Sequence, residues 1–182
     1  MRLRKNEYIV AAFFAGLTAI GAFLRIPAPV VPFNLQVLAV LLSGLVLGSR
    51  GGALAQAVYL LLGLSGLPVF SGGGGIAYIL SPTFGYLLSY IPCAWTAGKI
   101  ARRGAPSLLR YGAASAAGLM VVYAVGTAVL FLNLNYIAGK PSGILRVFQI
   151  GVLPFLWVDL LKGACASLFA FRLRRLLPGE FK

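Results

Sequence analysis

Apolar residues run through this chain in long blocks, which short groups of glycine, proline and basic residues interrupt. Because a bilayer core about 30 Å thick needs roughly 20 apolar residues in a helix, blocks that reach or approach this length predict membrane-spanning helices. The pattern predicts six spans, over about residues 8–24, 34–47, 53–64, 83–100, 111–132 and 145–173. We therefore expect an all-α membrane protein, a compact six-helix bundle that forms a single domain over residues 1–182.

Prolines and a glycine-rich turn mark where the predicted helices end or bend. Pro27, Pro29 and Pro32 in RIPAPVVPF forbid a continuing helix and favour a stiff, extended loop after the first span. The GSRGG segment predicts a tight turn between the second and third spans. Pro82 suits the first turn of the fourth span, and Pro154 predicts a kink in the sixth.

Composition and charge support a membrane protein. The chain is 60% hydrophobic and only 10% charged, whereas a soluble domain carries about 25% charged residues. In a soluble protein the net charge of +13 would suggest nucleic acid. Here the basic residues gather at the ends of the predicted spans, so we expect contact with the lipid bilayer and no nucleic-acid partner.

The basic residues also predict the orientation in the membrane. Of the 16 lysines and arginines, Arg25, Lys140 and Arg146 fall on one side, Lys162 falls inside the sixth span, and the rest share the side of both termini. The positive-inside rule then places both termini in the cytoplasm. We expect a multi-pass protein of the bacterial cytoplasmic membrane.

The sixth predicted span contains an acid and a base three residues apart, Asp159 and Lys162, in FLWVDLLKGA. Residues at this spacing share a helix face. Because a charge inside the membrane is costly, the pair predicts a ligand or ion site in preference to an ion pair that merely packs. A carboxylate acceptor beside an ammonium donor suits a small neutral group with both donors and acceptors.

Four glycines, Gly72 to Gly75, interrupt an apolar connection between the third and fourth spans. Non-helical backbone near a membrane is tolerated where protein buries it or where it lines a cavity. The apolar neighbours therefore favour a structured, cavity-lining loop over a flexible external one. The run is no phosphate loop, because GxxxxGK[ST] occurs nowhere in the chain.

Small residues recur every four positions in the first span, at Ala11, Ala15 and Ala19. Such a stripe permits close helix packing in a membrane, and internal packing and a partner surface explain it equally well. The chain has no histidine, and its two cysteines lie in apolar spans. We therefore expect no catalytic residue, no metal site, no cofactor and no enzymatic activity.

Taken together and in order, these motifs resemble the BioY family, the biotin-specific substrate-binding (S) components of energy-coupling-factor (ECF) transporters. The resemblance rests on VPFNLQ, YLLLGLSGLPVF, the glycine run, SPTFGYL and DLLKG, and it extends over most of the chain. Asn34, Ser81 and Phe84 depart from the usual threonine, glycine and glycine of the family. The resemblance implies a biotin pocket that opens outward beneath the loop between the first two spans. It also implies docking to a transmembrane coupling protein and two ATPase subunits.

The resemblance further implies roles for particular residues. Asp159 would accept from ureido N–H of biotin, and Lys162 would donate to the ureido carbonyl. The other expected ligand contacts are the walls Phe33, Tyr78 and Tyr86, the backbone N–H groups of Gly73 and Gly74 for the valerate carboxylate, and Gln36. The stripe of Ala11, Ala15 and Ala19 resembles the docking surface of S components. Two alternatives remain, an S component for another small vitamin and a proton-coupled carrier in which Asp159 titrates.

Overall fold

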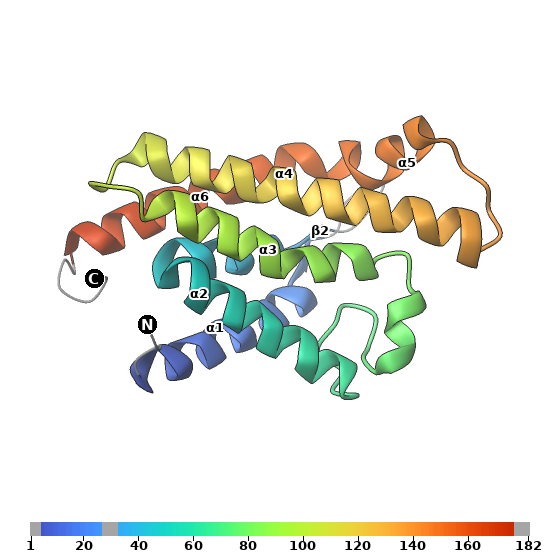
Figure 1. The fold of residues 1–182 in the computed structure, drawn as a ribbon, viewed down its shortest axis with the longest axis horizontal. Helices are drawn as coiled ribbons and strands as arrows, with labels where there is room; N and C mark the ends of the chain where they lie inside the picture. Colours follow the sequence, from blue (N-terminus) through green and yellow to red (C-terminus); the bar gives the residue numbers. More distant parts are fainter. Residues whose placement is uncertain (1–4, 27–32, 177–182) are drawn as a thin grey trace.

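A computed structural model of the 182-residue chain describes residues 5–26 and 33–176, and shows a bundle of helices aligned along one long axis (Figure 1). Its long helices are α1 (Lys5–Phe23), α2 (Gln36–Leu64), α3 (Phe84–Ala101), α4 (Leu108–Leu132) and α6 (Leu153–Leu176). The shorter elements are the strands β1 (Arg25–Ile26) and β2 (Phe33–Asn34), the 3₁₀ helix η1 (Ile76–Leu80), the π-helix η2 (Asn133–Ile137) and the helix α5 (Ile144–Gly151).

The order of packing across the bundle follows the chain. α1 packs on α2, α2 on α3 and α3 on α4, while α6 packs against both α2 and α4. β1 and β2 form a small antiparallel pair between α1 and α2, with Ile26 opposite Phe33. The prolines at positions 27, 29 and 32 lie outside the described residues.

Three helical stretches are long and apolar enough to cross a membrane: Gln36–Leu64, Leu108–Ile137 and Leu153–Leu176. A shorter apolar helix covers Glu7–Phe23. Large apolar side chains such as Leu109 and Met120 lie exposed on the outside of the bundle, where lipid can contact them. These features identify a multi-pass membrane protein.

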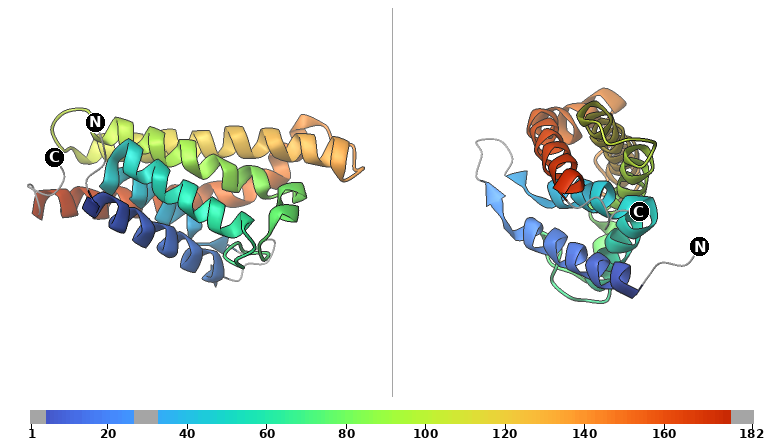
Figure 2. Two further views of the ribbon diagram at one scale, coloured as in Figure 1. Left: turned by 60° about the horizontal axis from the view of Figure 1, so that its bottom comes forward. Right: turned by 90° about the vertical axis from the view of Figure 1, so that its left-hand side faces the viewer.

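The α2 element is a hairpin of two helical halves. Gly48 has φ +78 and ψ −175, which breaks the helix there. Gly52 then lies against Gly44, where an added Cβ would come within 2.7 Å of the Gly44 Cα. The second half of α2 therefore runs antiparallel to the first, as Figure 2 shows. The helices predicted on either side of GSRGG are thus the two halves of one element, and the tight turn predicted between them is confirmed, with its non-helical residue at Gly48.

Glycines allow α2 and α3 to touch through their backbones. A Cβ on Gly44 would come within 2.4 Å of the Ala94 carbonyl oxygen, and a Cβ on Gly98 within 2.4 Å of the Gly48 carbonyl carbon. Small residues at membrane helix interfaces permit this approach. α3 therefore packs in direct backbone contact with the first half of α2, and the second half of α2 begins against that same half.

The predicted kink at Pro154 is a complete break. α5 ends at Gly151 and α6 begins at Leu153, because Pro154 has no backbone N–H and its ring opposes a continuing helix. The Phe155 and Leu156 N–H groups both donate to the Val152 carbonyl, at 3.1 and 3.0 Å. The Gly151 carbonyl instead accepts from the Tyr86 hydroxyl of α3 at 2.9 Å.

The alanine stripe of α1 faces mainly inward. Ala11 and Ala15 are 1% and 2% exposed and belong to the protein's own hydrophobic core, and Ala19 is half-buried. The expected docking role for Ala11 and Ala15 is therefore corrected, because α2 and the rest of the core already cover them. The small residues on the exposed face of α1 are Ala12 and Gly16.

Candidate functional site

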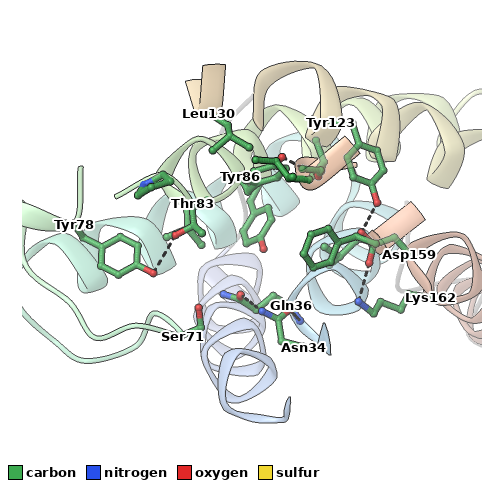
Figure 3. Close-up of a pocket in the computed structure, with 18 residues that line it drawn as sticks. Asn34, Gln36, Ser71, Tyr78, Thr83, Tyr86, Tyr123, Leu130, Asp159 and Lys162 are labelled. Carbon is green, nitrogen blue, oxygen red and sulfur yellow. Dashed lines mark hydrogen bonds and ion pairs between the residues drawn. The ribbon is translucent and has the colours of Figure 1, made fainter. Parts of the chain in front are cut away.

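A cavity of about 330 Å³ lies between the start of α2, the loop after it, α3, α4 and the break between α5 and α6 (Figure 3). Its volume falls in the range of small-molecule sites, roughly 300–1,000 Å³. Its polar lining residues are Asn34, Gln36, Ser71, Tyr78, Thr83, Tyr86, Tyr90, Tyr123, Asp159 and Lys162. Within the described residues, no group of three or more His, Cys, Asp or Glu side chains is placed to hold a metal ion.

Helical spacing explains why these side chains converge. Phe155, Asp159 and Lys162 are four and then three residues apart, so they share one face of α6. Thr83 and Tyr90 are seven residues apart at the start of α3, which is also close to a whole number of turns. Each helix therefore presents one inward stripe to the cavity.

The charged end of the cavity is built around the Asp159 carboxylate. Lys162 Nζ donates to Asp159 Oδ1 at 2.7 Å, and the two residues are 7% and 5% exposed. The hydroxyl of Tyr123, on α4, donates to Asp159 Oδ2 at 2.7 Å. The carboxylate is thus held by one donor on each oxygen, and the Lys162 ammonium still has two further N–H groups.

Amide and hydroxyl groups form a chain of hydrogen bonds at the start of α2. Asn34 Nδ2 donates to Gln36 Oε1 at 2.8 Å, and the Gln36 backbone N–H donates to Asn34 Oδ1 at 3.2 Å. Gln36 Nε2 donates to the Tyr59 hydroxyl at 2.6 Å, and Tyr59 donates to the Val69 carbonyl at 3.2 Å. These bonds fix both amide side chains, so Asn34 and Gln36 present oriented polar groups to the cavity.

Hydroxyl groups cluster at the end of the cavity away from Asp159, as Figure 3 shows for Tyr78 and Thr83. The Tyr78 hydroxyl and Thr83 Oγ1 are 3.3 Å apart, and Ser81 Oγ lies 2.9 Å from the same Thr83 oxygen. The lining residues at this end, Tyr78 and Thr83, offer hydroxyl groups that can donate or accept, and neither of them is charged.

Apolar side chains form the walls between the two ends. Val37, Leu87, Val122, Leu130, Ile150 and Phe155 line the cavity. Phe33 lies behind this wall, where its ring packs edge-on against Phe155 at 6.1 Å and Trp157 at 5.8 Å between ring centroids. Phe33 therefore supports the wall from behind. The sequence predicted that Phe33 lines the cavity, but it is not among the lining residues.

The glycine run forms a structured loop, but its glycines serve the loop itself. Gly73 and Gly75 have φ +117 and +101, which L side chains rarely adopt. A Cβ on Gly74 would come within 2.1 Å of the Leu67 carbonyl oxygen. The Gly73 N–H donates to the Phe70 carbonyl at 3.1 Å, so this donor is already used, and neither Gly73 nor Gly74 lines the cavity.

The structure thus brings together five of the eight expected ligand contacts: Gln36, Tyr78, Tyr86, Asp159 and Lys162. It adds lining residues that sequence reasoning missed: Asn34, Ser71, Thr83, Tyr90 and Tyr123. Asn34 lies in the VPFNLQ motif and Thr83 in the SPTFGYL motif, so the sequence held a signal that could have identified both as lining residues. The position of Tyr123 beside Asp159 had no local signal, because the two residues are 36 positions apart.

Comparisons with known proteins agree with one another. A family model described as the BioY family matches residues 1–179. The "Probable biotin transporter BioY" of Lysinibacillus sphaericus is 42% identical and covers 91% of this chain and 85% of its own. The "Biotin transporter BioY" of Thermotoga maritima is 40% identical and covers 94% and 97%. A crystal structure of the S-component for biotin from an ECF-type ABC transporter matches with a TM-score of 0.71 at 25% identity, over 96% of this chain and 95% of that one.

Proposed function

Because the chain belongs to the BioY family, we propose that it is a biotin-binding S component that mediates biotin uptake for an ECF-type transporter. One observation carries the proposal at the level of chemistry. The cavity contains a buried carboxylate and a buried ammonium in contact, Asp159 and Lys162. This pair complements the ureido ring of biotin, which has two N–H donors and one carbonyl acceptor.

The ureido ring binds at the charged end of the cavity in this proposal. The Asp159 carboxylate accepts from one ureido N–H group, and the Lys162 ammonium donates to the ureido carbonyl. Hydrogen bonds with an ionised partner are roughly twice as strong as neutral ones. A ligand without the ureido group leaves both buried charges without that partner, which is costly. Affinity and selectivity therefore arise from the same contacts.

The remainder of the ligand follows the cavity away from the pair. The apolar walls, with Tyr86 and Phe155 among them, cover the thioether ring and the aliphatic chain. The valerate carboxylate lies at the hydroxyl end, near Tyr78 and Thr83, with the Asn34 amide within the same lining. This assignment replaces the glycine-run amides, because the Gly73 N–H is bonded within its loop.

Energy for transport comes from a partner in this proposal. The 182 residues contain no GxxxxGK[ST] sequence, so we assign ATP hydrolysis to an ECF module with a transmembrane coupling protein and two ATPase subunits. Six spans with cytoplasmic termini in a bacterial cell membrane fit the basic-residue bias. The exposed face of α1, with Ala12 and Gly16, is the part of that helix that remains available for docking.

Calorimetric titration of purified protein with biotin tests the proposal. Wild-type protein should bind one biotin tightly, and Asp159→Ala should lose nearly all binding while it elutes as a folded monodisperse species in detergent. Binding by Asp159→Ala at wild-type affinity would place the ureido site elsewhere. Mass spectrometry of the ligand that co-purifies with the protein distinguishes biotin from another small vitamin.

A separate uptake assay distinguishes an S component from a proton-coupled carrier. Cells that express this chain with an ECF module should accumulate labelled biotin in proportion to ATP hydrolysis by the module. Uptake that collapses on addition of a protonophore while cellular ATP is maintained would instead support the carrier.

A further inference from the structure

The two ends of the cavity differ in charge. Among the described residues that line it, Asp159 and Lys162 are the charged ones, and they bond each other at 2.7 Å. The other end holds the hydroxyl groups of Tyr78 and Thr83, and Figure 3 shows the two ends on opposite sides of Tyr86. When the ureido ring occupies the ion pair, the described lining offers no second cation to the carboxylate of the ligand.

The two ends also differ in their access to water. Asp159 and Lys162 are 5% and 7% exposed, whereas Thr83 is an exposed residue. The contact between the Tyr78 and Thr83 hydroxyls lies at the surface. α3 starts here, at the end of the bundle away from the start of α1 and the end of α6 (Figure 1). A ligand held by its ureido ring at the buried end therefore has its carboxyl group at the mouth of the cavity.

Hydroxyl groups pair with a wider range of ligand groups than a cation does. An ammonium or guanidinium group only donates hydrogen bonds, whereas a hydroxyl can donate or accept. The hydroxyls of Tyr78 and Thr83 can therefore donate to a carboxylate, or pair with both the carbonyl and the N–H of an amide. A carboxamide thus loses no necessary partner at this end.

The size of the charge effect distinguishes this mouth from a site with a buried cation. Loss of one partner from a buried ion pair weakens binding on the order of a hundredfold or more. Here the fixed positive potential that the described lining supplies is the N-terminal end of α3, which begins at Phe84. Such an end favours an anion at an exposed position by about fivefold at most. Most of the affinity therefore comes from the ureido ring and the apolar walls.

We propose that the site takes carboxamides of biotin as well as biotin itself, so that biotin joined through its carboxyl group to an amine is a second class of ligand. This inference rests on the proposed function. The bicyclic ring enters first and binds Asp159 and Lys162, and the amide lies beside Tyr78 and Thr83. The group on the amide nitrogen extends into water, where it needs no pocket.

Calorimetric titration of the wild-type protein in detergent tests the inference with three ligands. They are biotin, biotinamide, which removes only the charge, and the amide of biotin with the ε-amino group of lysine, which also adds bulk. We expect both amides to bind within about tenfold of biotin.

Two results of these titrations would overturn the inference. A larger loss with biotinamide would show that the carboxylate has a cationic partner, as in a reversed ligand with its carboxylate on Lys162. A larger loss with the lysine amide alone would show that the mouth is closed to an extended ligand.

Two lysine substitutions locate the carboxyl group. Thr83→Lys places an ammonium group at the mouth and should raise the ratio of biotin affinity to biotinamide affinity about two- to fivefold, the scale of an exposed ion pair. Ala77→Lys is the matched control and should keep the wild-type ratio, because Ala77 is exposed in η1 and does not line the cavity. An unchanged ratio in a folded Thr83→Lys protein would also overturn the inference. If that variant does not fold, the wild-type titrations decide alone.

The outcomes separate this inference from the proposed function. Wild-type protein that does not bind biotin overturns both. Wild-type protein that binds biotin tightly but either amide more than about tenfold less tightly overturns only the inference on carboxamides.

Discussion

The ring of Tyr86 lies directly against Gly126, so closely that a Cβ at position 126 would come within 2.4 Å of a ring carbon. The same tyrosine lines the cavity and bonds the carbonyl that the α5–α6 break leaves free. The ring of Tyr86, on α3, can therefore occupy this place only because residue 126, on α4, is glycine.

Gly126→Ala should displace Tyr86 and weaken biotin binding. The added methyl group has no space, and overpacking of this kind costs roughly 1–3 kcal/mol of stability. Thermal unfolding and biotin titration of the purified variant measure the two effects. Gly112→Ala on the same helix is the control, because nothing lies within 4 Å of its Cβ; it should leave binding unchanged and raise stability by up to about 1 kcal/mol. Equal behaviour of the two variants would contradict the placement of Tyr86.

Single and double replacements of the ion pair should separate its effects on stability and on binding. Lys162→Met leaves the Asp159 carboxylate buried without its cation, which costs on the order of 3–5 kcal/mol. The double variant Asp159→Leu, Lys162→Met should recover most of that stability, since apolar replacement of a buried pair is often neutral. It should still bind no biotin. A double variant that unfolds as easily as Lys162→Met would show that the pair itself stabilises the bundle.

Gly74→Ala should destabilise the loop after α2. Its Cβ would meet the Leu67 carbonyl oxygen at 2.1 Å, so the loop must open and the melting temperature should fall together with biotin affinity. Gly143→Ala is a loop control with no atom within 4 Å of its Cβ and should behave as wild type. A Gly74→Ala protein with an unchanged melting temperature and lost biotin binding would restore a direct ligand role to the glycine run.

Leucine substitutions on α1 should distinguish its two faces. Ala15→Leu forces extra volume into the core, where Ala15 is 2% exposed, and should cost about 1–3 kcal/mol of stability. Ala12→Leu lies on the exposed face and should preserve stability and biotin binding. It should reduce co-purification with the ECF module, measured by affinity capture. Loss of stability in Ala12→Leu would contradict the orientation of α1.

Hydropathy predicted the helices well because a membrane chain must satisfy its backbone hydrogen bonds within each helix. The tight turn predicted at GSRGG is confirmed, but the sequence did not show that Gly48, with φ +78, is the glycine that leaves the helical conformation. Pro154 marked the correct place, but the sequence did not reveal a full break with a free Gly151 carbonyl. That outcome depends on Tyr86, which lies 65 residues earlier and supplies the missing donor.

In the candidate site, too, the sequence predicted local features and missed contacts between helices. Asp159 and Lys162 were visible from the sequence because their spacing and their apolar surroundings are local properties. Tyr123 was not, because its contact depends on how α4 packs against α6. The glycine run shows a third case. The sequence indicated a structured loop, but only the structure identifies Leu67 and Gly63 as the neighbours of Gly74.

The pairing of Asp159 with Lys162 also has an electrical consequence. Moving one elementary charge through a membrane potential of 100 mV changes the energy by about 2.3 kcal/mol. A lone aspartate on α6 would make any displacement of that helix across the bilayer depend on voltage. The 2.7 Å ion pair moves as a neutral unit, so these two side chains can change their depth in the membrane without work against the field.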